Sequence, residues 1–301
     1  MTGYALVLAA AVLWGLIGPV SKMAFDAGMP PLEAAFWRTA MAWVLYAIHA
    51  VCIGKVRIAR RDAPMIGAFG VLGVAGLFGF YVTAVKAGGA ALASVLLYTA
   101  PAWVAVMSYF LLKERMGSFK VAAVIATIIG VAGVSLGPQI DGSGPAVTTA
   151  AIVFGLLSGF CYALYYIFGK RYLGSYSTPT LFLYALPVGA LTLLPFFQFS
   201  HPDPKGYLAC AILAVCSTYG AYSVYYAGLK HLEATRAAVV ATLEPVVASV
   251  LAYFWYGETF TVTGYIGSAL ILGAVLMTVW DGARHRVGIK KRVLGDAGRS
   301  G

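Results

Sequence analysis

Residues 80–114, FYVTAVKAGGAALASVLLYTAPAWVAVMSYFLLKE, recur in altered form as residues 224–258, VYYAGLKHLEATRAAVVATLEPVVASVLAYFWYGE. A shift of 144 positions aligns the two copies without a gap, and the identical pairs include Tyr81 with Tyr225, Lys86 with Lys230, Pro101 with Pro245, Tyr109 with Tyr253, Phe110 with Phe254 and Glu114 with Glu258. A shift of 148 aligns Trp14 with Tyr162, Lys22 with Lys170 and Pro31 with Pro179. Chance identities in apolar sequence are mostly scattered alanines and valines, so these matches indicate an internal duplication.

The chain around the two copies has the composition of a membrane protein. Of its 301 residues, 61 % are hydrophobic and 11 % are charged, whereas a soluble domain carries about 25 % charged residues. So few charges cannot cover a globular surface, which excludes a soluble enzyme, a disordered chain, a coiled coil and a disulfide scaffold. The net charge of +10 follows the membrane topology, so it does not indicate a nucleic-acid partner.

Ten stretches are apolar enough to cross a bilayer, whose core is about 30 Å thick and requires about 20 apolar residues per helix. They are continuous rather than alternating, which favours helices over a β-barrel. The sequence therefore predicts an all-α integral membrane protein of ten transmembrane helices. The predicted spans lie near Tyr4–Val20, Ala34–Cys52, Met65–Ala84, Ala90–Leu112, Val121–Leu136, Thr149–Phe168, Leu181–Phe197, Leu208–Leu229, Ala237–Tyr256 and Val262–Val279.

Each copy of the duplication holds five spans, which divides the chain into a first repeat over residues 1–140, a second repeat over residues 145–282 and a basic tail over residues 283–301. Because five is odd, the second repeat enters the membrane from the opposite side. Inverted repeats related by a pseudo-two-fold axis in the membrane plane are a transporter design, with the substrate site near the midplane.

The basic residues predict the orientation of the chain. With ten crossings, 17 of the 21 Lys and Arg residues lie on the side of the termini, and only Lys22, Lys86 and Lys205 lie on the other, with Arg38 inside a span. Short loops rich in Lys and Arg stay in the cytoplasm. We therefore expect a multi-pass protein of the plasma (inner) membrane with both termini cytoplasmic. The first span has no basic residue before it and is long enough to cross, so we expect it to remain as a span.

Two ionisable side chains lie within the predicted spans. Glu244 is the one acidic residue deep in a span, where a charge costs about 2.5–3.5 kcal/mol on insertion scales and marks a functional site by default. It is a candidate partner for a substrate cation or a coupling proton, the alternative being a structural hydrogen bond. Arg38 lies about one turn inside span two, and either extends to the headgroups or turns inward, where its guanidinium suits a carboxylate.

The remaining candidates for a substrate cavity are prolines and aromatic residues. Pro101 and Pro245 lie mid-span, where proline removes a backbone hydrogen bond and is tolerated beside protein or a wet cavity. They predict matched hinges or kinks, the alternative being fixed kinks that serve packing. Trp14, Tyr98 and Tyr162 lie too deep for the interfacial belt, so they are candidate walls of the cavity or packing residues.

No metal, cofactor or catalytic site is expected. The four cysteines lack CxxC spacing, so they are expected to pack as small apolar residues. The four histidines lie at span ends or beyond, and the sequence contains no HExxH or P-loop motif, which argues against an intramembrane enzyme and against direct use of ATP.

Taken in order, these motifs resemble the EamA-type members of the drug/metabolite transporter superfamily. The resemblance rests on Trp14-Gly15, Arg38, Pro101, Leu243-Glu244-Pro245, Glu114 and Gly257-Glu258, and covers about residues 5–280. It implies a secondary transporter, often an exporter of amino acids or other small metabolites. One departure from symmetry is that Ala100 stands where the second repeat has Glu244.

We therefore expect an alternating-access transporter that exports small metabolites, with amino acids as the first expectation. The alternative cargo is a drug or another cationic compound, for which Glu244 would be the partner. The expected partners are a small-molecule substrate and the lipid bilayer. Proton exchange and uncoupled facilitation are both open, whereas a single buried acid does not favour a sodium site built from several carboxylates.

Overall fold

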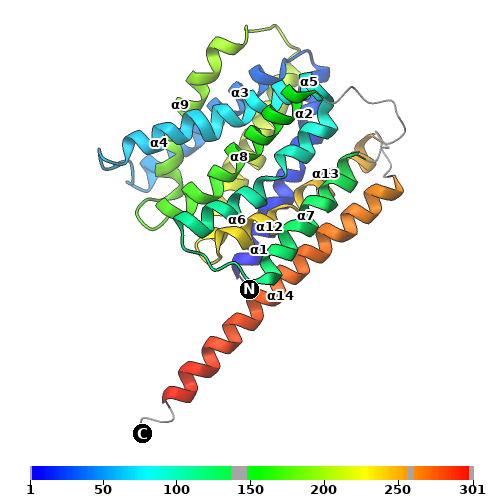
Figure 1. Cartoon of the computed structure of the whole chain (residues 1–301). Coiled ribbons are helices and arrows are strands. Elements are labelled where there is room, and N and C mark those ends of the chain that lie inside the picture. Colours follow the sequence, from blue (N-terminus) through cyan, green and yellow to red (C-terminus); the bar gives the residue numbers. More distant parts are fainter. Residues whose placement is uncertain (1, 137–147, 257–260, 298–301) are drawn as a thin grey trace.

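The computed structural model describes residues 2–136, 148–256 and 261–297, in which the regular elements are helices joined by short loops (Figure 1). The first half contains α1 (Thr2–Gly15), α2 (Ile17–Asp26), α3 (Pro31–Cys52), α4 (Ala63–Phe69), η1 (Gly70–Gly76), α5 (Leu77–Leu97), α6 (Ala100–Leu111) and α7 (Ser118–Leu136). The second half contains α8 (Thr149–Tyr172), α9 (Thr178–Leu193), η3 (Leu194–Phe196), α10 (Pro204–Ile212), η4 (Leu213–Gly220), α11 (Ala221–Leu229), α12 (Ala234–Ala241), α13 (Glu244–Tyr256) and α14 (Val262–Ala297). The Gly257-Glu258 motif, the join between the repeats near residues 140–145 and the side chains of the basic tail lie outside the described residues.

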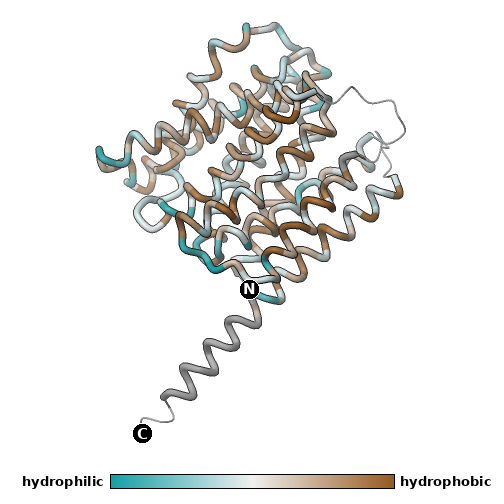
Figure 2. Tube along the Cα trace, in the orientation of Figure 1, coloured by the Kyte–Doolittle hydropathy of each residue, from teal (hydrophilic) through white to brown (hydrophobic). Residues whose placement is uncertain are grey.

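These helices make the ten predicted crossings, so the prediction of an all-helical membrane protein is confirmed. Seven stretches are long and apolar enough to span a bilayer: Thr2–Asp26, Ala63–Leu97, Thr149–Tyr172, Thr178–Phe196, Pro204–Leu229, Ala234–Tyr256 and Val262–Ala283. The stretch Ala63–Leu97 turns at Gly89, whose φ of 84° suits glycine, so it contributes to both the third and the fourth crossing. Helices α3 and α7 supply the second and the fifth crossing. Figure 2 shows hydrophobic residues along the bundle and hydrophilic residues at helix ends and loops.

The two mid-span prolines begin helices instead of kinking them. The fourth crossing breaks between the end of α5 and the start of α6, and the ninth breaks 144 positions later, between α12 and α13. Proline is favoured in the first turn of a helix because its missing N–H has no intrahelical partner there. Thr99 Oγ1 donates to the Leu96 carbonyl at 2.6 Å, and Thr242 Oγ1 donates to the Val239 carbonyl. These hydroxyls satisfy backbone oxygens that the breaks release inside the membrane.

A second matched irregularity was not predicted. The third crossing contains the π-helical segment η1, and the eighth contains η4. The shift of 144 positions aligns Gly70, the first residue of η1, with Ala214, and η4 begins one residue earlier, at Leu213. π-Helical turns are rare and occur frequently at functional sites. The two halves therefore share both their helix breaks and their π-helical segments.

The two halves interlock through equivalent contacts. Helix α5 packs on α8, and its counterparts α11 and α12 pack on α1, whereas α3 packs on α9 and α7 on α14. Helices α7 and α14 approach closely at glycines, since a Cβ atom at Gly267 would lie 2.3 Å from the Gly130 carbonyl oxygen. This arrangement places the two helix breaks between the halves, around the centre of the bundle.

Candidate functional site

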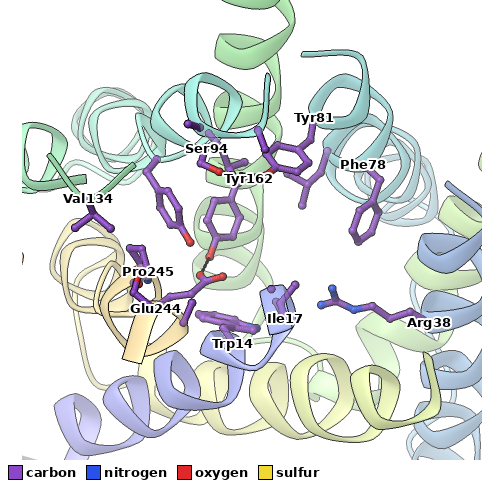
Figure 3. Close-up of a pocket in the computed structure, with 18 of the residues that line it drawn as sticks. Trp14, Ile17, Arg38, Phe78, Tyr81, Ser94, Val134, Tyr162, Glu244 and Pro245 are labelled. Atoms are coloured by element: carbon purple, nitrogen blue, oxygen red, sulfur yellow. Dashed lines mark hydrogen bonds between the residues drawn. The ribbon is translucent and has the colours of Figure 1, made fainter. Parts of the chain in front are cut away.

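A cavity of about 450 Å³ lies between the halves. Its principal lining residues are Trp14, Ile17, Arg38, Leu77, Phe78, Tyr81, Ser94, Tyr98, Val134, Tyr162, Tyr222, Glu244, Pro245, Ala248 and Ser249 (Figure 3). Six of the seven candidate residues from the sequence line it. Pro101 does not, because it lies buried in the first turn of α6. The roles of all seven in transport remain predictions.

Glu244 enters this cavity because α13 begins there. It is the first residue of α13, directly after the break, and the Tyr162 hydroxyl donates to its Oε2 at 3.1 Å. The Tyr98 hydroxyl interacts with the same carboxylate. The start of a helix carries a partial positive charge that favours a carboxylate. The break therefore places an acidic group, held by aromatic hydroxyls, at the middle of the ninth crossing.

Arg38 turns inward instead of extending to the lipid headgroups. Its side chain is 7 % exposed, and Figure 3 shows its guanidinium pointing into the cavity, toward the side that holds Glu244. Its Nε donates to Thr218 Oγ1 at 2.6 Å, and its carbon Cζ lies 5.7 Å from the centre of the Phe78 ring. Among the described residues, no carboxylate forms an ion pair with Arg38. Within the part of the chain that the structure describes, a largely buried cation therefore faces the cavity without a paired anion.

Aromatic side chains form most of the remaining wall. Trp14 is 2 % exposed and packs against Tyr222 and Tyr225, with ring centres 5.3 and 5.1 Å apart. The rings of Tyr98 and Tyr162 lie 6.5 Å apart, approximately edge to face. An apolar wall with a few convergent polar groups is the usual form of a small-molecule site.

The cavity reaches toward one end of the bundle. Its lining includes Gly18, Ala90 and Val134, which lie toward the helix ends opposite the N terminus. The other end, which carries Thr2 and the start of α7, is named the terminal end. Between the cavity and the terminal end, the side chains of three tyrosines are fully or almost fully buried: Tyr166, Tyr225 and Tyr226.

Polar contacts hold the terminal end together, both between the two halves and within the second half. The Glu114 carboxylate accepts hydrogen bonds from the Ala234 amide at 2.6 Å, from the Thr235 amide at 3.3 Å and from Thr235 Oγ1 at 2.9 Å. Lys170 Nζ donates to the carbonyl oxygens of Leu229 at 3.0 Å and Leu232 at 2.5 Å. We name Glu114, Lys120, Lys170, Glu233 and Arg236 the terminal clamp.

Glu233 is the charged centre of this clamp. It pairs with Lys120 at 2.8 Å and with Arg236 at 2.6 Å. Burial opposes its ionisation, but the hydrogen bonds from both cations outweigh burial and hold the pKa of Glu233 below its usual value. Because this pKa is lowered, Glu233 stabilises the fold above the ordinary carboxyl pKa and loses that contribution as pH falls through the lowered value.

Comparison with known proteins identifies the family. The model of the EamA-like transporter family matches residues 1–136 and 149–280. The chain belongs to the EamA-like transporter family. It is therefore a membrane transporter, and the family is one of transporters and not of enzymes.

Individual relatives of this EamA-like protein agree with that conclusion. An uncharacterized transporter of Archaeoglobus fulgidus is 31 % identical over 267 residues, which cover 87 % of this chain and 92 % of the relative. The uncharacterized inner membrane transporter YicL of Salmonella typhimurium is 25 % identical over 288 residues, covering 93 % and 95 %. A solved crystal structure aligns with a TM-score of 0.81 at 19 % identity, covers 94 % of this chain and 98 % of its own, and shows the same fold.

Phe78, Tyr81 and Ser94, which line the cavity of this EamA-like protein, were missed by the sequence analysis, and so was Thr218. Thr218 does not line the cavity but holds Arg38 at its edge. The signal for it was the adjacent polar pair Ser217-Thr218 inside an otherwise apolar span. Phe78 and Tyr81 carried no such signal, since aromatic residues are numerous throughout the chain.

Proposed function

We propose that this transporter exports amino acids by alternating access. The observation that carries the proposal is a cavity in which a guanidinium and a carboxylate face one another (Figure 3). An amino acid is a zwitterion, so its carboxylate suits Arg38 and its ammonium group suits Glu244. Planar, bidentate recognition of a carboxylate is the characteristic use of arginine.

The charge of Arg38 also separates amino acids from the alternative cargo. A drug or another cationic compound would pair with Glu244, but it would meet the positive charge of Arg38 in the same cavity. Like charges that face each other in a site of low dielectric repel strongly. The cavity thus favours a zwitterion over a simple cation.

Alternating access is supported by the duplication and by the state of the two ends. The cavity reaches toward the end opposite the termini, whereas the terminal clamp and the buried tyrosines close the terminal end. Exchange of conformation between the halves would close the first end and open the second. We assign Glu244 a second role, as the site that binds a proton when no substrate is bound. We assign export as the direction of transport because the sequence resembles amino-acid exporters.

The substrate class is tested by transport into liposomes that contain the purified protein. Each radiolabelled amino acid is compared with the amine that lacks its carboxylate, with and without an imposed proton gradient. We expect at least one amino acid to be transported about tenfold better than its amine, since a lost charge-assisted hydrogen bond is worth about 1.5–3 kcal/mol. Preferred transport of the amines would instead identify a cation exporter.

We further propose that the terminal end faces the cytoplasm across the inner membrane, as the basic residues indicate. In a variant with Cys52 replaced by serine, a cysteine at the exposed Gly174 should react with a membrane-impermeant thiol reagent only after permeabilisation. A cysteine at the exposed Asp26, on the other side, should react in intact cells. Reaction of Gly174→Cys in intact cells would reverse the orientation.

A further inference from the structure

The guanidinium of Arg38 is held in place by the π-helical segment η4. Thr218 Oγ1 accepts from Arg38 Nε at 2.6 Å and donates to the carbonyl of Leu213, five residues earlier, at 3.2 Å. The carbonyl of Ser217 accepts from Arg38 Nη2 at 3.4 Å. Both residues of η4 that contact Arg38 are buried, and Thr218 is 4 % exposed. The π-helical turn thus presents a hydroxyl and a carbonyl to one side chain of α3.

These bonds use one edge of the guanidinium and leave another free. Nε and Nη2 form the side of the planar group that faces η4. Arginine carries five N–H donors in a fixed fork, so the remaining donors on Nη1 and Nη2 form a second edge suited to a carboxylate. Since the guanidinium points into the cavity (Figure 3), the bonds to η4 set the direction of that second edge.

The equivalent helix contact in the first half, between α9 and η1, shows that the fold does not require this polar contact. There α9 packs on η1 as α3 packs on η4. The position matched to Thr218 is Val74, and the position matched to Arg38 is Leu186. Both are buried, at 1 % and 2 % exposure. The same helix packing therefore forms with apolar side chains. The polar pair Arg38 and Thr218 occurs only where α3 meets η4, beside the cavity.

We propose that Thr218 is a positioning residue, which orients Arg38 to bind the carboxylate of the substrate. The proposal rests on the function proposed above and adds the group that aligns its anion-binding side chain. Thr218 acts through Arg38 and does not itself touch the cavity. Its removal is expected to weaken substrate binding more than the rate of the transport cycle.

The first test compares variants in liposome transport of the amino acid preferred by the wild type. Thr218→Val keeps the shape of the side chain and removes the hydroxyl, whereas Thr218→Ser keeps the hydroxyl. Thr127→Val, in α7, removes a buried hydroxyl that donates to the Ala123 carbonyl of its own helix. We expect Thr218→Val to raise the apparent KM about tenfold with little change in maximal rate, and the other two variants to resemble the wild type.

The second test needs no substrate, so it separates this proposal from the proposed cargo. Phenylglyoxal modifies arginine side chains, and mass spectrometry measures its reaction at Arg38 against the exposed Arg115. Release from Thr218 should speed modification of Arg38 several-fold in Thr218→Val but not in Thr218→Ser. Faster modification in a protein that transports no amino acid supports the positioning of Arg38 and contradicts only the cargo. Equal modification in all three proteins overturns the proposal, as does a Thr218→Ser variant that behaves like Thr218→Val.

Discussion

Replacement of Glu244 by glutamine is expected to remove most amino-acid transport while the protein remains folded. Glutamine keeps the size of the side chain and an oxygen that accepts the hydrogen bond from Tyr162, but it carries no charge. The ammonium group of a substrate would lose its partner in a cavity where Arg38 repels it. Hydrogen bonds to charged groups are worth about 1.5–3 kcal/mol, so uptake into liposomes should fall about tenfold to a hundredfold.

A second buried carboxylate offers the matched control. Glu33 is fully buried outside the cavity, where it accepts hydrogen bonds from the amide and hydroxyl of Ser200. Glu33→Gln should therefore transport nearly as well as the wild type, and thermal unfolding should show both variants to be folded. If Glu244 also exchanges protons, Glu244→Gln should abolish any pH dependence of transport. A Glu244→Gln protein with wild-type transport at every pH would leave the carboxylate a structural role alone.

Replacement of Glu114 by alanine is expected to shift the protein toward a state that is open at the terminal end. Glu114 belongs to the first half, and it caps the start of α12 in the second half through two amides and a hydroxyl. Loss of a helix cap and of hydrogen bonds between the halves destabilises the closed terminal end. A change of roughly 1.4–3 kcal/mol would alter the ratio of the two states about tenfold to a hundredfold.

Reporter cysteines distinguish this shift from local fraying of α12. Ala237 is fully buried behind the terminal clamp, and Ala91 lines the cavity toward the opposite end. In a background without other reactive cysteines, Glu114→Ala should speed thiol modification of Ala237→Cys and slow that of Ala91→Cys. Glu114→Gln, which keeps an acceptor oxygen, should lie between. Faster reaction at residue 237 with no change at residue 91 would indicate fraying and argue against a gate.

The number of crossings and the duplication were readable from the sequence because each depends on local properties. The length of an apolar stretch predicts a membrane helix whatever that helix packs against. The proline, lysine and aromatic residues of the two repeats align without a gap, so the duplication is visible in the sequence. Ionisable Arg38 and Glu244 were also recognised in isolation, since a charge within an apolar span is unusual. The structure places both on one cavity, and their roles in transport remain proposals.

The helix breaks and the π-helical segments were not predicted, because tertiary contacts select among backbone forms that the sequence allows. Pro101 and Pro245 are compatible with a kink or with a new first turn. In the structure both lie in new first turns, and the hydroxyls of Thr99 and Thr242 bond carbonyl oxygens at the breaks. Nothing in the sequence of η4 distinguishes an i+5 turn from an i+4 turn. The role of Thr218 followed from its distance to Arg38, which no spacing in the sequence encodes.

The paired breaks and π-helical segments have a consequence for how this protein can be redesigned. The helix breaks and the π-helical segments are present twice, whereas Arg38, Thr218 and Glu244 are each present once, opposite Leu186, Val74 and Ala100 at the matched positions. In the mechanism proposed here, single-copy side chains determine selectivity, and the paired breaks and π-helical segments serve movement. Because the matched break and π-helical segment of the first half form with Ala100 and Val74 at these positions, we expect exchange of the three single-copy side chains to change the transported substrate while the backbone features are kept.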